Sequence, residues 1–287
     1  MAALLKEYGT KTRTYGDESV VRKEALTLGY ASSALESVWP KSSCPPNLKQ
    51  YYDVLLISHG GSGSSSGFKY FTNVLGVNSI HMNYVDDRDS LKHRDFFSLS
   101  RILVQCNVTA RIIVYQLGDP TDAVFSLYRR GYAEAHFKKL RPAFHELTCT
   151  RGIQRNVLLY AHAKQDLIGL SDHLDSYLMG SNSRPVVFMN AVGRNMPGFA
   201  SEIRKILMTF GVVFNGAGGN NTIDSIDTKQ PNEEERIDET SSLESKYRDM
   251  NGYAEMRTTY QRMTNTVGIL SPLSVCVQGR IYRWTKQ

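Results

Sequence analysis

The stretch Ser58–Gly67 (SHGGSGSSSG) consists almost entirely of glycine and serine, a composition that suits the binding of an anion. Glycines let the backbone curl without Cβ clashes, so that successive N–H groups can point at one phosphate or sulfate group. Serine hydroxyls can add further donors. The candidate anion-binding residues are therefore Ser58, His59, Gly60, Gly61, Ser62, Gly63, Ser64, Ser65, Ser66 and Gly67.

An apolar run precedes this loop and a helical pattern follows it. Val54–Ile57 is fully apolar, which is typical of a strand buried on both faces. The apolar residues between Phe68 and Leu75 recur at helical spacing, and Gly76 supplies a stop. Because a helix N-terminus adds partial positive charge, the order strand, loop, helix predicts a phosphate-binding loop. The alternative is a flexible Gly/Ser turn without a ligand.

The loop departs from the pattern that binds nucleoside triphosphates. That pattern places Lys and then Ser or Thr directly after the last glycine. Here Gly67 is followed by Phe68, Lys69 and Tyr70, so no hydroxyl stands where Mg²⁺ would be held. Lys69, one turn into the expected helix, is the candidate cation for the anion.

A second stretch with chemical potential is RIIVYQLGDPTDAVFSLYRR, which begins at Arg111. Arg111–Leu117 predicts a buried strand, and Asp119 followed by Pro120 is typical of a helix N-cap and first helical position. Both this segment and the Gly/Ser loop leave strands at their carboxyl ends, where open α/β sheets bind ligands.

Strand and helix patterns alternate along most of the chain. Further strands are expected at Ser79–Tyr84, Pro185–Asn190 and within Val275–Trp284, and further helices at about Asn156–Leu178, Phe199–Phe210 and Leu243–Met263. This alternation predicts an α/β fold: a three-layer, doubly wound, mostly parallel sheet that contains a P-loop-like strand–loop–helix.

We expect one domain, residues 51–287, preceded by a lead-in, residues 1–50, that packs on it. Asn220–Thr240 carries seven acidic and two basic residues, a net charge of −5, and since the whole chain carries +6 the remainder carries +11. We interpret the region near 215–242 as a mobile acidic surface loop, with a functional lid as the alternative.

Composition narrows the classes of function. Hydrophobic residues make up 41% and charged residues 22%, which is ordinary for a globular protein. The net charge is not gathered in a Lys/Arg run, so we expect a small anionic ligand rather than nucleic acid. The first residues lack the apolar core of a signal peptide, and no run approaches the about 20 apolar residues that span a bilayer, so a cytoplasmic location without membrane contact is expected.

Cysteine and acidic residues give no sign of a cross-link or a metal. The four cysteines are far apart and form no CxxC pair, so we expect neither a disulfide framework nor a zinc site. A short acidic cluster is interpreted as solvated, and no metal is expected there: Asp86, Asp87 and Asp89.

Two of these stretches resemble the sulfotransferase family. The segment Val54–Leu75 occupies the place of the family's loop for the 5′-phosphosulfate of 3′-phosphoadenosine 5′-phosphosulfate (PAPS). RIIVYQLGDPTDAVFSLYRR is similar to the family's strand ending in Arg-Asp-Pro-x-Asp and the helix after it, in which a serine binds the 3′-phosphate; Ser126 has that offset. The segment from Asp172 to Gly211 is similar in its order of elements. The resemblance implies metal-free transfer of a sulfuryl group from PAPS to a hydroxyl or amine of a small molecule or glycan.

The chain also departs from the family pattern. Gly118 stands where the family has arginine, the loop contains no lysine, and the C-terminal Arg-Lys-Gly segment is absent. By position, Lys69 is the candidate catalytic cation and Arg130 the candidate replacement for the missing arginine, with Arg129 and Arg280 as further alternatives.

The resemblance implies a histidine base between the second strand and the Asp-Pro strand. His93 has that place and His81 is its rival; an unperturbed histidine titrates near pH 6.5 and can accept a proton. Two other functions stay open: a catalytically degenerate binding protein of the same fold, and a P-loop nucleotide kinase or hydrolase that depends on Mg²⁺. The sequence leaves the acceptor and the oligomeric state open.

Overall fold

The computed structural model describes residues 44, 48–60, 62, 67–68, 70–80, 94–129, 166, 168–190, 200–214 and 253–283. Most of the lead-in, the acidic region near 215–242 and the cluster Asp86, Asp87 and Asp89 lie outside these residues, and so do the predictions made for them. Within the described residues, no helix has the length and apolar character needed to cross a membrane.

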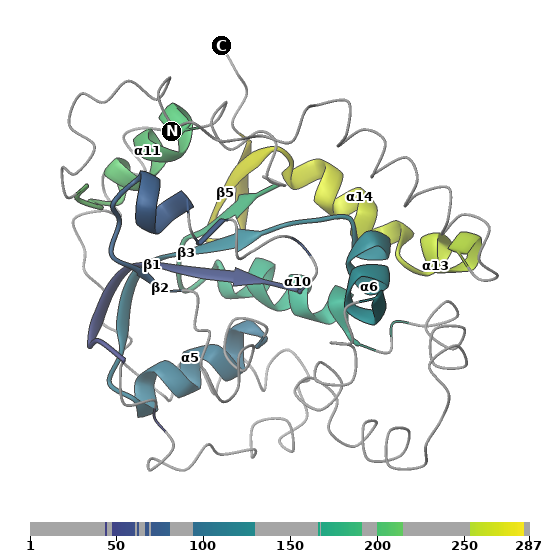
Figure 1. Ribbon diagram of the computed structural model, residues 1–287, viewed down its shortest axis with the longest axis horizontal. Coiled ribbons are helices and arrows are strands. Elements are labelled where there is room, and N and C mark those ends of the chain that lie inside the picture. Colours follow the sequence, from purple (N-terminus) through teal and green to yellow (C-terminus); the bar gives the residue numbers. More distant parts are fainter. Residues whose placement is uncertain are drawn as a thin grey trace.

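A six-stranded sheet with the order β2-β1-β3-β4-β5-β6 lies at the centre of the described residues (Figure 1). The strands are β1 (Tyr51–Ser58), β2 (Ser79–Ile80), β3 (Thr109–Gln116), β4 (Val186–Met189), β5 (Leu273–Val277) and β6 (Arg280–Arg283). The first four are parallel, whereas β5 and β6 are antiparallel to their neighbours. The expected α/β class is confirmed, in the form of a mixed sheet.

The C-terminal part of the sheet is a hairpin rather than the single strand expected within Val275–Trp284. Val277 pairs with Arg280, so the turn between them has two residues. Gln278 and Gly279 both have positive φ angles, 50° and 70°, as a tight hairpin turn of this kind requires. The sequence did not indicate this hairpin, because glutamine, which stands at the first turn position as Gln278, is not typical of such turns.

Helices cover both faces of the sheet and give the three expected layers. The first face carries α5 (Phe96–Gln105), α6 (Pro120–Arg129), α10 (Leu170–Gly180), α13 (Tyr253–Thr259) and α14 (Gln261–Leu270); the second carries η2 (Tyr70–Val74) and α11 (Ala200–Thr209). In β1, Leu55 and Ile57 face the first layer and Val54 and Leu56 the second, and all four are fully buried. Burial on both sides explains why this strand is a continuous apolar run.

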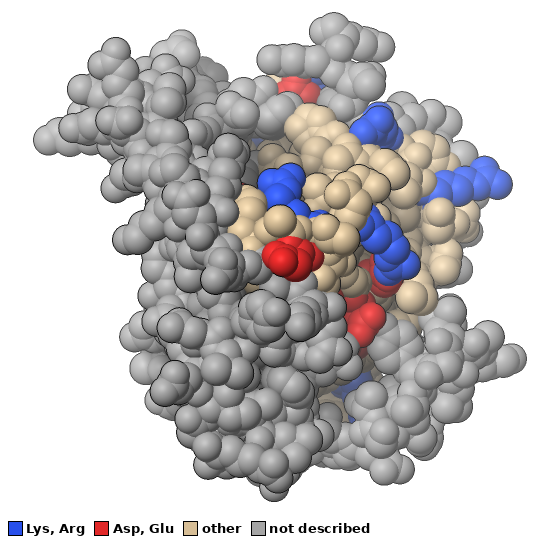
Figure 2. All heavy atoms as spheres, turned by 90° about the vertical axis from the view of Figure 1, so that its right-hand side faces the viewer, with Lys and Arg blue, Asp and Glu red and all other residues tan. Residues whose placement is uncertain are grey.

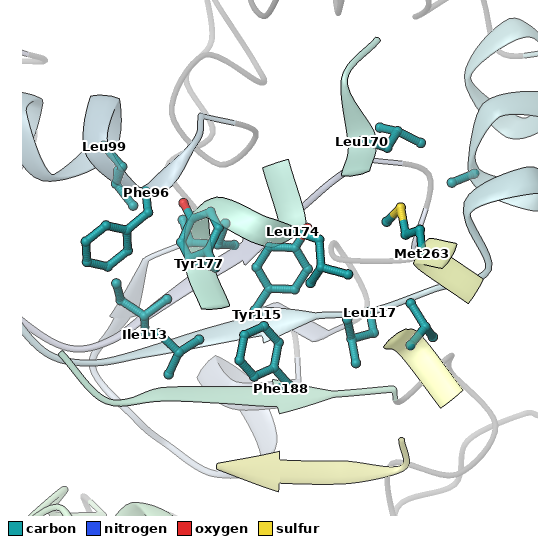
Figure 3. Packing of buried hydrophobic residues seen from close by; sticks show 14 of the residues in the cluster. Phe96, Leu99, Ile113, Tyr115, Leu117, Leu170, Leu174, Tyr177, Phe188 and Met263 are labelled. Atoms are coloured by element: carbon teal, nitrogen blue, oxygen red, sulfur yellow. The ribbon is translucent and has the colours of Figure 1, made fainter. Parts of the chain in front are cut away.

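Tyr115 of β3 lies at the centre of the first face (Figure 3). Its ring centroid is 4.9 Å from that of Tyr177 and 5.5 Å from that of Phe188. Its hydroxyl lies 2.8 Å from Nδ1 of His173, and burial raises the pKa of Tyr115 well above its usual value. The aromatic cluster thus fixes β3 against α10. It also holds in place the carboxyl end of β3, which borders the candidate site described below.

The connections around β1 create a switch point in the sheet. From β1 the chain passes through η2 on the second face to β2, and from β2 through α5 on the first face to β3, on the other side of β1. The segments that leave the carboxyl ends of β1 and β3 therefore diverge to opposite faces between adjacent strands. Such a crevice is where open α/β sheets bind ligands.

A disulfide joins Cys44 to Cys106, and the expectation of no disulfide framework is wrong. Cys106 is the C-cap of α5, and Cys44 precedes β1, so the bond ties the residues before the sheet to the end of a helix on the first face. Among the described cysteines, Cys276 is free and buried, and its Sγ lies 2.9 Å from Ser181 Oγ. Spacing along the chain could not reveal the pair because the two cysteines lie 62 positions apart in the sequence.

Candidate functional site

The structure describes six of the predicted ligand residues: Ser58, His59, Gly60, Ser62, Gly67 and Ser126. The first five lie at the carboxyl end of β1 and the sixth lies on α6. The remaining predicted site residues lie outside the described residues: Gly61, Gly63, Ser64, Ser65, Ser66, Lys69, His81, His93 and Arg130.

The Gly/Ser stretch starts where β1 ends. Ser58 and His59 are fully buried, and Gly60 adopts a φ of 85°, in the region that glycine reaches without strain. The helix expected after the loop is observed as the π-helix η2, in which Leu75 N–H donates to Tyr70 O over 3.0 Å. Gly76, with a φ of 61°, follows it as the expected stop. Among the described residues, a strand therefore precedes the Gly/Ser stretch and a helix follows it.

Gln116, the last residue of β3, lies beneath the loop. Its Nε2 donates a hydrogen bond to the carbonyl of Ser62 over 2.7 Å, and the side chain is fully buried. At the last residue of the stretch, a Cβ added to Gly67 would lie 2.2 Å from Gln116 Oε1. One amide side chain thus bonds to the middle of the Gly/Ser stretch and lies against its last residue. Sequence reasoning missed Gln116, although a polar residue in an otherwise apolar strand was a usable signal.

Gly118 brings the segment after β3 against the same loop. A Cβ at this position would lie 2.9 Å from Ser62 Cβ and 3.2 Å from Ser62 Cα. These distances are shorter than ordinary van der Waals contacts, so any side chain here would displace the loop or β3. The departure from the sulfotransferase pattern therefore has a structural cause: the loop occupies the space that a side chain at position 118 would need.

His59 is a buried, neutral histidine between the two segments. Its Nδ1 lies 2.9 Å from the carbonyl of Gly60 and so donates, which leaves Nε2 as the unprotonated nitrogen. Nε2 is buried and lacks a hydrogen-bond partner among the described residues. Burial lowers the pKa of His59 below its usual value, against smaller opposing effects of the Gly60 and Gly118 carbonyls and of Asp119 and Asp166.

Acidification is expected to destabilise the fold through His59. Because its pKa is lower in the folded state, the unfolded chain binds more protons below pH 6.5, and stability falls by up to about 1.4 kcal/mol per pH unit as the pH drops. His59→Gln should remove this part of the pH dependence. Urea denaturation at pH 7.5, 6 and 5 measures it, with each variant compared with itself across pH. Equal pH slopes in both proteins would contradict the assignment.

The predicted N-cap after β3 is confirmed. A carboxylate oxygen of Asp119 accepts hydrogen bonds from the N–H groups of Thr121 (2.8 Å) and Asp122 (3.1 Å), and α6 begins at Pro120. This cap fixes the start of α6 next to the switch point, at the carboxyl end of β3. Ser126 lies two turns into α6 and is partly buried.

Arg257 of α13 interacts electrostatically with the acidic residues of this cap. α13 packs on α6 through stacked Phe125 and Tyr253 rings, 5.5 Å apart. Hydrogen bonding to the Tyr253 hydroxyl raises the pKa of Arg257, and the charges of Asp119 and Asp122 contribute. Arg257 was missed by sequence reasoning because it lies more than 130 residues beyond Asp119.

Arg280, one alternative to the missing family arginine, lies at the wrong edge of the sheet. It starts β6 and pairs with Val277, beyond the pair Val186–Cys276 at the amino end of β4. Figure 2 views the side on which α6, α13 and α14 lie; there the described Lys and Arg side chains form separate blue patches with acidic groups between them. The described part of this side is therefore not a continuous basic surface.

Asp166 is a structural acid beside the site. Its carboxylate accepts hydrogen bonds from the N–H groups of Gly169, Leu170 and Ser171 (2.9, 3.0 and 2.7 Å) and from the Tyr260 hydroxyl (2.7 Å). Asp166 thereby provides hydrogen-bond acceptors for the free N–H groups at the start of α10. Through Tyr260 it also connects α10 to α13 and α14. The sequence gave no indication of this role, since Asp166 lay within a stretch expected to be helical.

Together these features define an α/β protein with a candidate ligand site between the carboxyl ends of β1 and β3. Comparison of the chain with protein-family models, with curated proteins and with solved structures found no match. The function is therefore argued from the site alone.

Proposed function

We propose that the chain binds the phosphosulfate of PAPS in the Gly/Ser loop and transfers its sulfuryl group to a hydroxyl or amine of a small molecule or glycan. The observation that carries this proposal is the position of the loop. It leaves β1 at the switch point, and its residues Ser62 and Gly67 pack on Gln116 and Gly118 of the adjacent segment. The Asp119-capped helix α6, with Ser126, begins beside it.

The proposed reaction needs a cradle, a cation and a base. The acceptor oxygen or nitrogen would form a bond to sulfur while the bond from sulfur to the bridging phosphate oxygen breaks. The acceptor's proton would pass to a histidine, for which His93 and His81 stay the candidates, and Lys69 would stabilise the leaving phosphate. Ser126 and Arg130 would hold the 3′-phosphate. A cytoplasmic location stays part of the proposal, although the disulfide favours an oxidising compartment.

A catalytically degenerate binding protein is the second candidate. It is favoured by Gly118, because the tight contact with Ser62 excludes the arginine that the resembling family uses for the 3′-phosphate. Such a protein would retain the anion site and lack turnover. A nucleotide kinase or hydrolase would require Mg²⁺. This hypothesis gains no support from the sequence, because the loop lacks the Lys-Ser/Thr pair.

Thermal-shift measurements with three ligands test the proposal. A ligand that binds only the folded state raises the melting temperature in step with RT ln(1 + [L]/Kd). Stabilisation by 3′-phosphoadenosine 5′-phosphate but not by ATP with Mg²⁺ supports the sulfotransferase reading, and a turnover assay with PAPS then separates enzyme from degenerate binder. Stabilisation by ATP with Mg²⁺ alone supports the kinase or hydrolase. A response to free sulfate alone, or to none of the three, rejects the nucleotide site.

Ser126→Ala is expected to weaken binding of 3′-phosphoadenosine 5′-phosphate by about 10- to 100-fold, because a hydrogen bond to a charged group contributes about 1.5–3 kcal/mol. Isothermal titration calorimetry measures the change. Thr258→Ala, an exposed helical hydroxyl on α13, is the control and should bind the nucleotide as the wild type does. Equal affinities of the Ser126 variant and the control would remove Ser126 from the site.

A further inference from the structure

The turn between α5 and β3 carries an acceptor motif for asparagine-linked glycans. Asn107-Val108-Thr109 has the form Asn-x-Ser/Thr without proline in the middle, and Asn107 is exposed. It is the one such motif whose asparagine lies among the described residues; the other in the chain, Asn220-Asn221-Thr222, lies outside them. Glycosylation at such a motif requires the asparagine amide and the hydroxyl two positions later on an accessible segment, and this turn provides both.

The backbone of the motif is fixed by the end of α5. Cys106 is the C-cap of the helix, and Asn107 follows it with a φ of 52°. The N–H of Asn107 donates to the carbonyl of Val104 over 3.1 Å. The N–H of Val108 donates to the carbonyl of Leu103 over 2.8 Å. This is the Schellman pattern of a helix end, in which glycine usually occupies the position of Asn107 and asparagine sometimes does. Glycine would fit the turn as well, and asparagine adds the acceptor amide.

The disulfide beside this turn gives an independent indication of the cellular compartment. Cys106, the residue before Asn107, is bonded to Cys44. Structural disulfides form and persist in oxidising compartments, and the acceptor motif is used in secreted proteins that pass through such compartments. A covalent cross-link in the fold and an exposed acceptor motif are separate observations, and both point to the secretory route.

We infer that Asn107 is a glycosylation site that carries an asparagine-linked oligosaccharide. The donor is an oligosaccharide carried on a polyprenyl diphosphate. Asn107 Nδ2 forms a bond to the anomeric carbon of the first sugar while the bond from that carbon to the diphosphate oxygen breaks, and the amide gives up one proton. The inference does not depend on the proposed sulfuryl transfer. It opposes the cytoplasmic location given above, and its test decides between the two locations.

A glycan at Asn107 would lie far from the candidate ligand site. Asn107 precedes the amino end of β3, where Thr109 pairs with Tyr51, whereas the site lies at the carboxyl end, where Gln116 pairs with Ser58. The eight residues of β3 span about 23 Å at about 3.3 Å per residue. The glycan would therefore leave the ligand site accessible, and the two proposals can be tested separately.

The test uses the full chain isolated from the cells that make it. No leader is added, because the first residues lack the apolar core of a signal peptide and an added leader would impose the answer. Treatment with a peptide-N-glycosidase in heavy-oxygen water turns a glycosylated asparagine into labelled aspartate, which mass spectrometry locates. We expect label at position 107 in treated protein and none in untreated protein. Thr109→Ser, which keeps the motif, should keep the label, whereas Thr109→Val should lose it.

Asn107→Gly removes the acceptor and keeps the turn, because glycine adopts a positive φ without strain. Its band on a denaturing gel should move faster than that of the wild type by the step of one glycan. Asn265→Gln, at an exposed asparagine outside any acceptor motif, should migrate as the wild type does. Unmodified Asn107 in protein whose Cys44 and Cys106 are bonded would overturn the inference, as would label at Asn220 alone. Unmodified Asn107 together with free thiols at both cysteines would overturn it and support the cytoplasmic location.

Discussion

Cys44→Ser is expected to lower the free energy of unfolding by about 3–4 kcal/mol. The disulfide to Cys106 closes a loop across a sequence separation of 62, and chain-entropy arguments assign about 4 kcal/mol to a loop of that size. The bond also holds the residues before β1 against the end of α5, so its loss frees the start of the central strand. Guanidinium denaturation under oxidising conditions measures the change.

The double variant Cys44→Ser/Cys106→Ser provides the control. Reductant should destabilise the wild type by the amount that the double variant loses, and should leave the double variant unaffected. If the oxidised and reduced wild-type proteins unfold at the same denaturant concentration, the bond makes no contribution and the prediction is wrong. Because disulfides persist mainly in oxidising compartments, recovery of the bonded form from cells also tests the cytoplasmic expectation.

The elements around the loop could be predicted because their signals are local. The apolar run Val54–Ile57 lies in β1, the cap Asp119 starts α6, and the alternation of strand and helix gives the α/β class. Each depends on a few adjacent residues and on a period that the backbone imposes. The predicted strand Pro185–Asn190 matches β4 to within a residue at each end for the same reason.

The contacts that define the site could not be predicted because they join distant parts of the chain. Gln116 was counted as part of an apolar strand, and only the pairing of β1 with β3 places its amide under Ser62. Gly118 was interpreted as a lost arginine, whereas its contact with the loop shows a steric reason for glycine. Pairing of Cys44 with Cys106 likewise depends on where α5 ends relative to the start of β1.

These contacts suggest how the site holds its shape. The segment that ends β3 approaches the Gly/Ser stretch closely, through the Gln116 amide and the backbone at Gly118. Gln116 and the neutral His59 are both buried polar groups at this junction, and neither carries charge at neutral pH. Among the described residues, the junction therefore contributes polar groups without charge, and the anion binding proposed above would draw its positive charge from other groups.

Gly67→Ala is expected to destabilise the protein by about 2 kcal/mol and to weaken nucleotide binding at least tenfold. The new Cβ would lie 2.2 Å from Gln116 Oε1, so the buried amide has to move and its bond to Ser62 has to break. Overpacking of this kind costs about 1–3 kcal/mol, and release of the loop adds a loss of preorganisation at the ligand. Denaturation and titration with 3′-phosphoadenosine 5′-phosphate measure the two effects.

Two further variants separate the clash from the general effect of replacing a glycine. Gly268→Ala, at a position in α14 where a Cβ would meet nothing within 4 Å, should stabilise the protein by about 0.5–1 kcal/mol. In the background Gln116→Ala, the change Gly67→Ala should have almost no further effect on stability, because the obstructing amide is gone. Nucleotide affinity should stay low in that double variant, since Ser62 has lost its hydrogen-bond donor. Recovery of affinity along with stability would show that Gln116 only fills space beneath the loop.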